Sequence, residues 1–129
     1  MARLAGELGY PCAEEVMATR VRRVIGRRGQ RLFVAENGAG AVCGWLQASG
    51  SDAIESGFRV EIVGLVVESA ARRAGVGRRL VAAAEQWAAK IGAETVCARS
   101  NIQRRASHLF YRQLGYETVK TQKVYRKRL

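Results

Sequence analysis

A glycine-rich turn between an apolar strand and an amphipathic helix carries the strongest chemical signal in the chain. Within residues 60–91, Gly75 and Gly77 stand where the helix should begin. Backbone amides at a helix start have no intrahelical partner, and the helix dipole adds positive potential there. Four arginines flank the turn: Arg72, Arg73, Arg78 and Arg79. The segment therefore predicts a site for a phosphate or pyrophosphate, as in a nucleotide-type cofactor.

Two common glycine loops do not fit this turn. A Walker-type loop needs a lysine and then a serine or threonine after its second glycine, where Arg78 and Arg79 stand, so it is excluded. A dinucleotide fingerprint needs a third glycine at the position of Leu80. It also needs an acidic residue after the next strand, where Arg99 and Ser100 stand. The dinucleotide interpretation is therefore disfavoured.

A third pattern, R-x-x-G-x-G, matches residues 72–77 and follows a strand that carries L-x-V at Leu65 and Val67. About 30 residues later comes a second motif, in which Asn101 precedes the ASHLFYRQLGY of residues 106–116. On these two motifs the sequence resembles the GCN5-related N-acetyltransferase (GNAT) family, which transfers acetyl from acetyl-coenzyme A (acetyl-CoA) to an amine. The resemblance runs from about residue 13 to the carboxyl end.

The resemblance implies a role for each matching position. Backbone groups of Leu65 and Val67 would pair with the pantetheine arm, as an added strand pairs with a sheet edge. Backbone amides of residues 73–78 would hold the pyrophosphate, and amides near Val66 would stabilise the charge that grows on the thioester oxygen. The complete set of cofactor-binding positions is Leu65, Val66, Val67, Arg72, Arg73, Ala74, Gly75, Val76, Gly77, Arg78 and Asn101. No metal is expected.

Acetyl transfer requires an amine that has lost its proton and a leaving thiolate that gains one. An alkylammonium of pKa about 10 is roughly one part in a thousand neutral at pH 7, so a base assists. The resemblance places Tyr111 near the sulfur, where its hydroxyl can act as the acid. The alternative is a tyrosine with a buried ring and a solvated tip. No covalent acyl-enzyme is required.

Glu61 is the candidate base, directly or through water. It is the only acidic residue inside an otherwise apolar strand, where an unpaired charge is costly and often functional. The alternative is an ion pair with Arg59 or Arg99. Asp52 and Glu55, in the preceding polar segment, either attract a cationic acceptor or form a plain solvated loop.

The remaining aromatic and histidine side chains are less informative about chemistry. His108, the only histidine, suits a surface or capping role better than catalysis. Trp87 is expected in the core, and Trp45 either in the core or in the wall of the acceptor pocket.

The composition is that of one soluble domain of 129 residues. Cys12, Cys43 and Cys97 are too few and too scattered for a disulfide framework, which favours a reduced cytoplasmic setting. No apolar run approaches the roughly 20 residues of a membrane span, so no membrane partner is expected. The formal net charge is +11, and the last 29 residues hold eight basic groups against one acidic group.

A basic surface suits anionic partners in general, and by itself it does not establish nucleic-acid binding. The acceptor is expected to be a small-molecule amine, such as an antibiotic amino sugar, or a protein amino group. A non-catalytic basic module that binds acyl-CoA or nucleic acid is the alternative function.

The elements that must position these residues alternate between helix and strand. Hydrophobic periodicity predicts helices over residues 3–9, 13–28, 78–91 and 103–114, and strands over 31–36, 41–49, 59–67 and 94–100. Residues 50–57 are expected to form a polar loop, and the tail from residue 116 one or two antiparallel strands. The fold class is α/β (α+β), with a mixed, mostly antiparallel sheet and one parallel βαβ crossover. This is the GNAT-like acyl-CoA N-acyltransferase fold.

The front of the chain departs from the family pattern, which usually begins with a strand that pairs with the one matching residues 31–36. No segment here is left for that first strand. The edge formed by residues 31–36 would then expose unpaired backbone groups, so we expect a partner subunit, as in a homodimer, or a local rearrangement to cover it.

Overall fold

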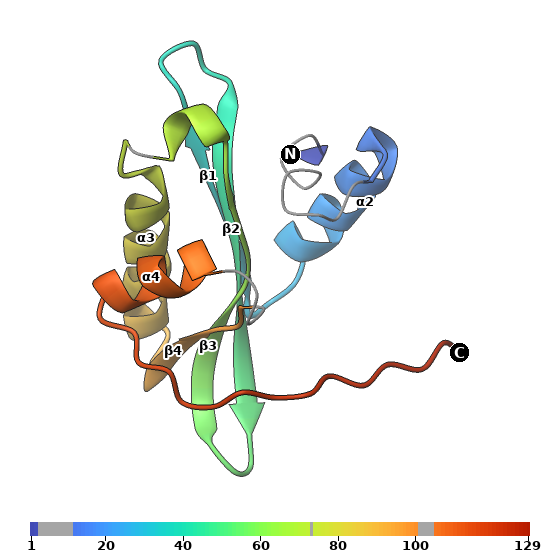
Figure 1. The fold of residues 1–129 in the computed structure, drawn as a ribbon. Coiled ribbons are helices and arrows are strands. Elements are labelled where there is room, and N and C mark those ends of the chain that lie inside the picture. Colours follow the sequence, from blue (N-terminus) through green and yellow to red (C-terminus); the bar gives the residue numbers. More distant parts are fainter. Residues whose placement is uncertain (3–11, 73, 101–104) are drawn as a thin grey trace. The chain divides into compact units, whose positions relative to one another are not determined.

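Four strands in chain order, β1-β2-β3-β4, form the sheet of the amino-terminal part (Figure 1). Their bounds are β1 Gln30–Glu36, β2 Val42–Ala53, β3 Gly57–Val67 and β4 Thr95–Ala98. The pairs β1–β2 and β2–β3 are antiparallel, and β3–β4 is parallel. The predicted mixed, mostly antiparallel sheet with one parallel crossover is therefore confirmed.

The computed structural model describes residues 1–2, 12–72, 74–100 and 105–129. The chain forms two compact units, Met1–Arg99 and Ser100–Leu129, and each is described by itself. The helix predicted over residues 3–9 lies outside the described residues. No helix of the described ranges has the length and apolar character needed to cross a membrane.

A helix covers each face of the sheet (Figure 1). On one face lies α3, Val76–Lys90, whose Trp87 ring meets the Phe33 ring edge-on at 6.5 Å between centroids. On the other lies α2, Glu14–Ile25, whose Met17 packs against buried Trp45 and Val66. Burial of apolar surface between these layers is the main force that holds the unit together.

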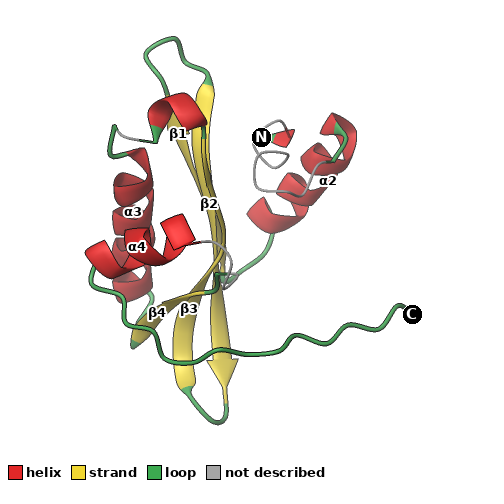
Figure 2. Cartoon of the chain, in the orientation of Figure 1, coloured by secondary structure: helices red, strands yellow, loops and turns green. Residues whose placement is uncertain are grey.

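β2 and β3 form one long ribbon, which corrects the predicted polar loop at residues 50–57 (Figure 2). Their pairing continues to Ala53 opposite Gly57, so only residues 54–56 remain as the connection. The polar residues of this segment tolerate a strand because a ribbon that extends beyond the core can expose its side chains. Asp52 therefore lies on a strand, opposite Phe58, and Glu55 lies in the turn.

A β-bulge at Val63 interrupts the register between β2 and β3. Gln47 pairs with Gly64 and the next residue, Ala48, pairs with Ile62, so Val63 has no partner on β2. Side chains alternate between the two faces of a strand. Because of the extra residue, odd-numbered and even-numbered positions of β3 change faces at the bulge. Ile62 before the bulge faces α3, whereas Gly64 after it faces α2, although both positions are even-numbered.

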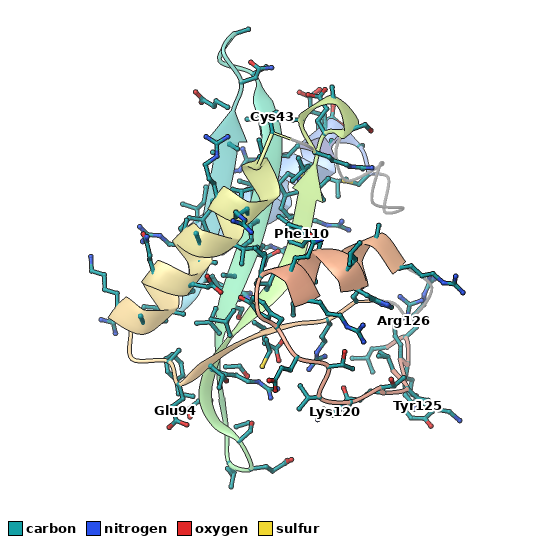
Figure 3. All side chains as sticks on the ribbon, turned by 60° about the vertical axis from the view of Figure 1, so that its left-hand side comes forward. Cys43, Glu94, Phe110, Lys120, Tyr125 and Arg126 are labelled. Carbon is teal, nitrogen blue, oxygen red and sulfur yellow. The ribbon has the colours of Figure 1, made fainter. Side chains whose placement is uncertain are left out.

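The second unit contains α4, Arg105–Gln113, followed by a tail without regular structure. The prediction of one or two strands from residue 116 onward is therefore wrong. Alternation alone does not make a strand, since a strand also needs a partner with which to bond. Along the tail, Tyr125 is 86% exposed, and Figure 3 shows Lys120 and Arg126 on the same segment.

Close packing at Gly44 of β2 sets the position of the amino-terminal end of α3. A Cβ at this position would lie 3.2 Å from Val66 O and 3.2 Å from Val76 Cγ1. Only a residue without a side chain lets the helix start approach the sheet so closely. Neighbouring Cys43 is 2% exposed and lies beside the same end of α3 (Figure 3).

We predict that Gly44→Ala lowers the free energy of unfolding by about 1–3 kcal/mol, as overpacking in a filled core does. Gly38→Ala is the matched control, because a Cβ there meets no atom within 4 Å. Urea denaturation of both variants measures the effect. Equal midpoints for the two variants would contradict the proposed packing role.

Candidate active site

The amino-terminal end of α3 has the open backbone that an anion site requires. Its N-cap residue, Gly75, has φ +77° and gives no side-chain cap to the helix. A Cβ on Gly75 would meet no atom within 4 Å. The amides of Val76, Gly77 and Arg78 belong to the first helical turn, where no intrahelical acceptor exists. These amides are therefore left for a ligand.

Two of the surrounding arginines hold the backbone of the turn. Arg72 donates from Nε to the carbonyl of Val67 at 3.0 Å, which ties the turn to the end of β3. Arg79 donates from Nε to Gly75 O at 3.4 Å and from its NH2 nitrogen to Ala74 O at 3.2 Å. The turn is thus shaped by side chains that bind its carbonyls. The amide of Ala74 donates to Ala71 O at 3.2 Å, so the amides open to a ligand are those at the start of the helix.

Arg79 is a residue whose role the sequence interpretation missed. Its spacing of four residues from Gly75, within the first turn of a helix, was a signal that it could reach back to the loop carbonyls. Arg78, predicted to add charge to the pyrophosphate, is exposed. Arg73 and Asn101 lie outside the described residues.

The carboxyl-terminal half of β3 has a backbone edge that no described strand covers. β4 pairs with β3 only from Arg59 to Ile62, and the pairing ends directly before the bulge at Val63. Residues 63–67 keep β2 on one side and have no strand on the other within the described part of the chain. The edge therefore offers amides at Leu65 and Val67, where the pantetheine arm was predicted to bind. The carbonyl of Val67 already accepts from Arg72. Val66 is buried, and its side chain faces α2.

Glu61 forms the ion pairs that its alternative interpretation named. Its Oε1 lies 3.0 Å from an Arg59 nitrogen and 3.3 Å from an Arg99 nitrogen. The carboxylate is 21% exposed and faces α2, since its neighbours Val60 and Ile62 are buried on the α3 face. Oε2 has no hydrogen-bond partner among the described residues. This oxygen is positioned to bind a water or an amine.

Tyr111 lies in the second unit, on α4, within an aromatic cluster. Its ring centroid lies 5.2 Å from that of Phe110 and 5.5 Å from that of Tyr116, and both contacts are edge-on. Its carbonyl accepts the amide of Tyr116 at 3.0 Å, which closes the end of the helix. The ring is therefore held by packing, and its assignment as the acid stays a prediction.

A cleft of about 310 Å³ opens beside the bulge, on the α2 face of the sheet. Its lining residues come from α2, the first three strands and the amino-terminal segment: Met1, Cys12, Met17, Arg20, Val21, Val24, Leu32, Trp45, Gln47, Val63 and Gly64. Trp45 belongs both to the core and to this wall. Asp52 and Glu55 do not line the cleft. This favours the alternative in which both are simply solvated and do not attract the acceptor.

The site fits coenzyme A on its own geometry. An uncapped helix start suits a diphosphate, and an uncovered strand edge suits the two amides of a pantetheine arm. Among the described side chains, no group of three or more His, Cys, Asp or Glu is arranged to bind a metal ion.

This fold and site are those of an acyltransferase that binds an acyl-CoA beside a splayed strand. The model of the acetyltransferase (GNAT) family matches residues 5–116, and the chain belongs to this family. The protein is therefore an acetyl-CoA-dependent N-acetyltransferase, with acetyl-CoA as its co-substrate. No protein of curated function matches the chain.

Solved structures share the fold along nearly the whole chain. The aminoglycoside N-acetyltransferase AAC(6')-Iy, in complex with CoA, has a TM-score of 0.87 at 21% identity over 99% of this chain and 86% of its own. AAC(6')-Ih from Acinetobacter baumannii gives a TM-score of 0.81 at 19% identity, covering 93% of this chain and 84% of that one. A transcriptional regulator from Bacillus halodurans C-125 gives 0.80 at 27% identity, covering 95% and 88%.

We predict that Gly75→Asp weakens binding of acetyl-CoA at least tenfold, because it places a negative charge at the pyrophosphate position. Gly75→Asn is the matched control, since it has the same shape and backbone demands without the charge. Titration calorimetry at two salt concentrations measures both affinities. If the two variants bind acetyl-CoA equally, the diphosphate does not lie at this helix start.

Proposed function

We propose that residues 1–129 form one acetyltransferase domain that moves acetyl directly from acetyl-CoA to the primary amine of a small molecule. The observation that carries this proposal is the junction of two open backbone segments, the uncapped start of α3 and the uncovered edge of residues 63–67. Both lie within the first unit, and Arg72 connects them through its bond to Val67.

The cofactor would be held mainly by backbone. The amides of Gly75, Val76, Gly77 and Arg78 bind the diphosphate, together with Arg73. The amide of Ala74, predicted as a fifth donor, is instead bonded to Ala71 O within the turn. Leu65 and Val67 bind the pantetheine amides through their main chain, while Asn101 binds nearer the acetyl end. Arg72 acts through the Val67 carbonyl, so it positions the edge and adds positive potential.

Acetyl-CoA supplies the acetyl group, and its thiol leaves when the new C–N bond replaces the C–S bond. The amide of Val67, on the free side of the strand, donates to the carbonyl oxygen as negative charge develops there. The amide of Val66, the other predicted donor, is directed toward β2 by the register of the pair. The hydroxyl of Tyr111 gives its proton to the sulfur. Glu61, through Oε2 and a water, receives the proton that the amine loses.

A small-molecule acceptor is supported by the structural neighbours that are named as aminoglycoside N-acetyltransferases. The cleft beside Val63 adjoins the strand segment assigned to the acetyl end and is the place where such an amine would bind. The three cysteines are free thiols, which agrees with the cytoplasmic setting that we propose.

We also propose that the protein is a homodimer joined through the outer edge of β1. This strand has a pairing partner on one side only, and a groove of about 470 Å³ lies along it, between residues 32–36 and α3. Val34 is 48% exposed on this strand. A second β1 would satisfy the free backbone groups and cover the apolar groove.

Tyr111→Phe is expected to lower kcat by about 10²-fold or more, the usual size of a general-acid contribution, and to leave the affinity for acetyl-CoA unchanged. Release of free thiol with a panel of primary amines measures turnover and tests the proposed activity itself. Tyr125→Phe, in the exposed tail, is the control. Unchanged turnover of Tyr111→Phe would remove this residue from the mechanism.

For the dimer, Val34→Lys should convert the protein to a monomer, because lysine on an edge strand opposes pairing. Ile54→Lys, at a fully exposed turn position, should leave the mass unchanged. Light scattering coupled to gel filtration gives the mass of each variant. A monomeric parent protein would refute the proposed interface.

A further inference from the structure

The cleft beside the bulge owes its shape to the register shift between β2 and β3. At the bulge, Val63 turns outward and is 56% exposed, while Gly64 leaves the cleft floor without a side chain. A Cβ on Gly64 would lie 3.1 Å from Cζ3 of the Trp45 ring. The edge of the six-membered indole ring therefore lies against the strand at Gly64, and the ring forms one wall. At about 310 Å³, the cleft lies at the small end of the range for small-molecule sites.

Most of the lining is apolar. The aliphatic side chains come from three elements, with Val21 and Val24 on α2, Leu32 on β1 and Val63 on β3, and the thioethers of Met1 and Met17 add to this surface. Gln47 is polar, but its side-chain amide nitrogen already donates to Gln30 Oε1 at 3.1 Å. Such a surface gains free energy by covering an apolar body of matching size.

The charge of the lining is positive rather than negative. Arg20 of α2 is its one charged member among the described residues, and no carboxylate lines the cleft within that part of the chain. Glu61 lies on the same face of the sheet, but Arg59 and Arg99 both neutralise its Oε1. An acceptor with several ammonium groups would find no carboxylate among the described lining residues to replace the water that it loses on binding.

We propose that the acceptor of this enzyme is an apolar monoamine, aromatic or branched aliphatic, and not a polycationic amino sugar. The inference rests on the proposed function, because it assigns the cleft to the acceptor of that reaction. The reacting amine is the single polar group that must enter. Its body packs on Trp45 and the valines, and Arg20 at the mouth repels a second positive charge. Several structural neighbours are named as aminoglycoside N-acetyltransferases, so the acceptor proposed for this chain differs from the acceptor in those names.

The test compares 2-phenylethylamine with kanamycin as acceptors at saturating acetyl-CoA, by initial rates of thiol release. The expected kcat/KM is at least tenfold higher for 2-phenylethylamine. Val63→Glu should then lower kcat/KM for 2-phenylethylamine at least tenfold. It should also reduce the ratio of the two kcat/KM values, that for 2-phenylethylamine over that for kanamycin. Val16→Glu is the matched control, since Val16 lies on α2 and is exposed but does not line the cleft.

A wild-type protein that prefers kanamycin overturns the inference and leaves the acetyltransferase activity intact, whether or not the Val63→Glu variant folds. If neither amine is acetylated, calorimetry of each amine with the CoA-bound protein decides, and tighter binding of kanamycin again overturns the inference. Failure of acetyl-CoA itself to bind refutes the proposed cofactor site. Calorimetry of the two amines with the free protein then still tests the cleft.

Discussion

The interruption of strand pairing at Val63 is the constraint on which the site depends. Backbone amides and carbonyls are strongly driven to pair, and an unpaired edge inside a protein costs free energy unless a ligand or water completes it. Here β4 stops pairing at Ile62, one residue before the bulge, so no strand of the described ranges pairs with this edge of residues 63–67. An extended molecule with its own amides can complete that edge. The sheet thus leaves the space of a strand, and the pantetheine arm has the chemistry to fill it.

The same interruption links the two ends of the reaction. By adding one residue, the bulge directs the side chains of Leu65 and Val67 toward the α3 side, while Gly64 and Val66 face the α2 side, where Gly64 lines the cleft. In the proposed function, a single strand would thus present cofactor contacts along its edge and acceptor contacts on its α2 face. The approach of α3 at Gly44 fixes the distance between this edge and the helix start. Without the bulge, the residues after Val63 would face the opposite sides of the sheet.

Much of this arrangement could be predicted from the sequence because it depends on local patterns. The glycines at 75 and 77 and the apolar run before them define the strand, turn and helix, and the order of elements gives the mixed sheet. The bulge was not predicted, although Gly64 beside Val63 is a signal for one, because an isolated glycine inside a strand often marks a bulge. The extension of the ribbon to Ala53 and the unpaired tail also escaped prediction, because both depend on whether a partner strand is present rather than on alternation. For Glu61, the sequence left two roles open, a catalytic base or a partner in an ion pair with Arg59 or Arg99. The structure shows that both arginines pair with it at once.

The basic character of the chain has an internal explanation in the first unit. Arg72 and Arg79 bind backbone carbonyls of the cofactor turn, and Arg59 and Arg99 bind the carboxylate of Glu61. These four guanidinium groups are used to hold main chain and to orient one acid, which a lysine with a single point of charge would do less well. These four arginines therefore have roles within the fold, whereas most of the excess positive charge lies in the last 29 residues. A net positive charge creates a field that favours a cofactor with several phosphate charges, and under the proposed specificity the same field would oppose an acceptor with several ammonium groups.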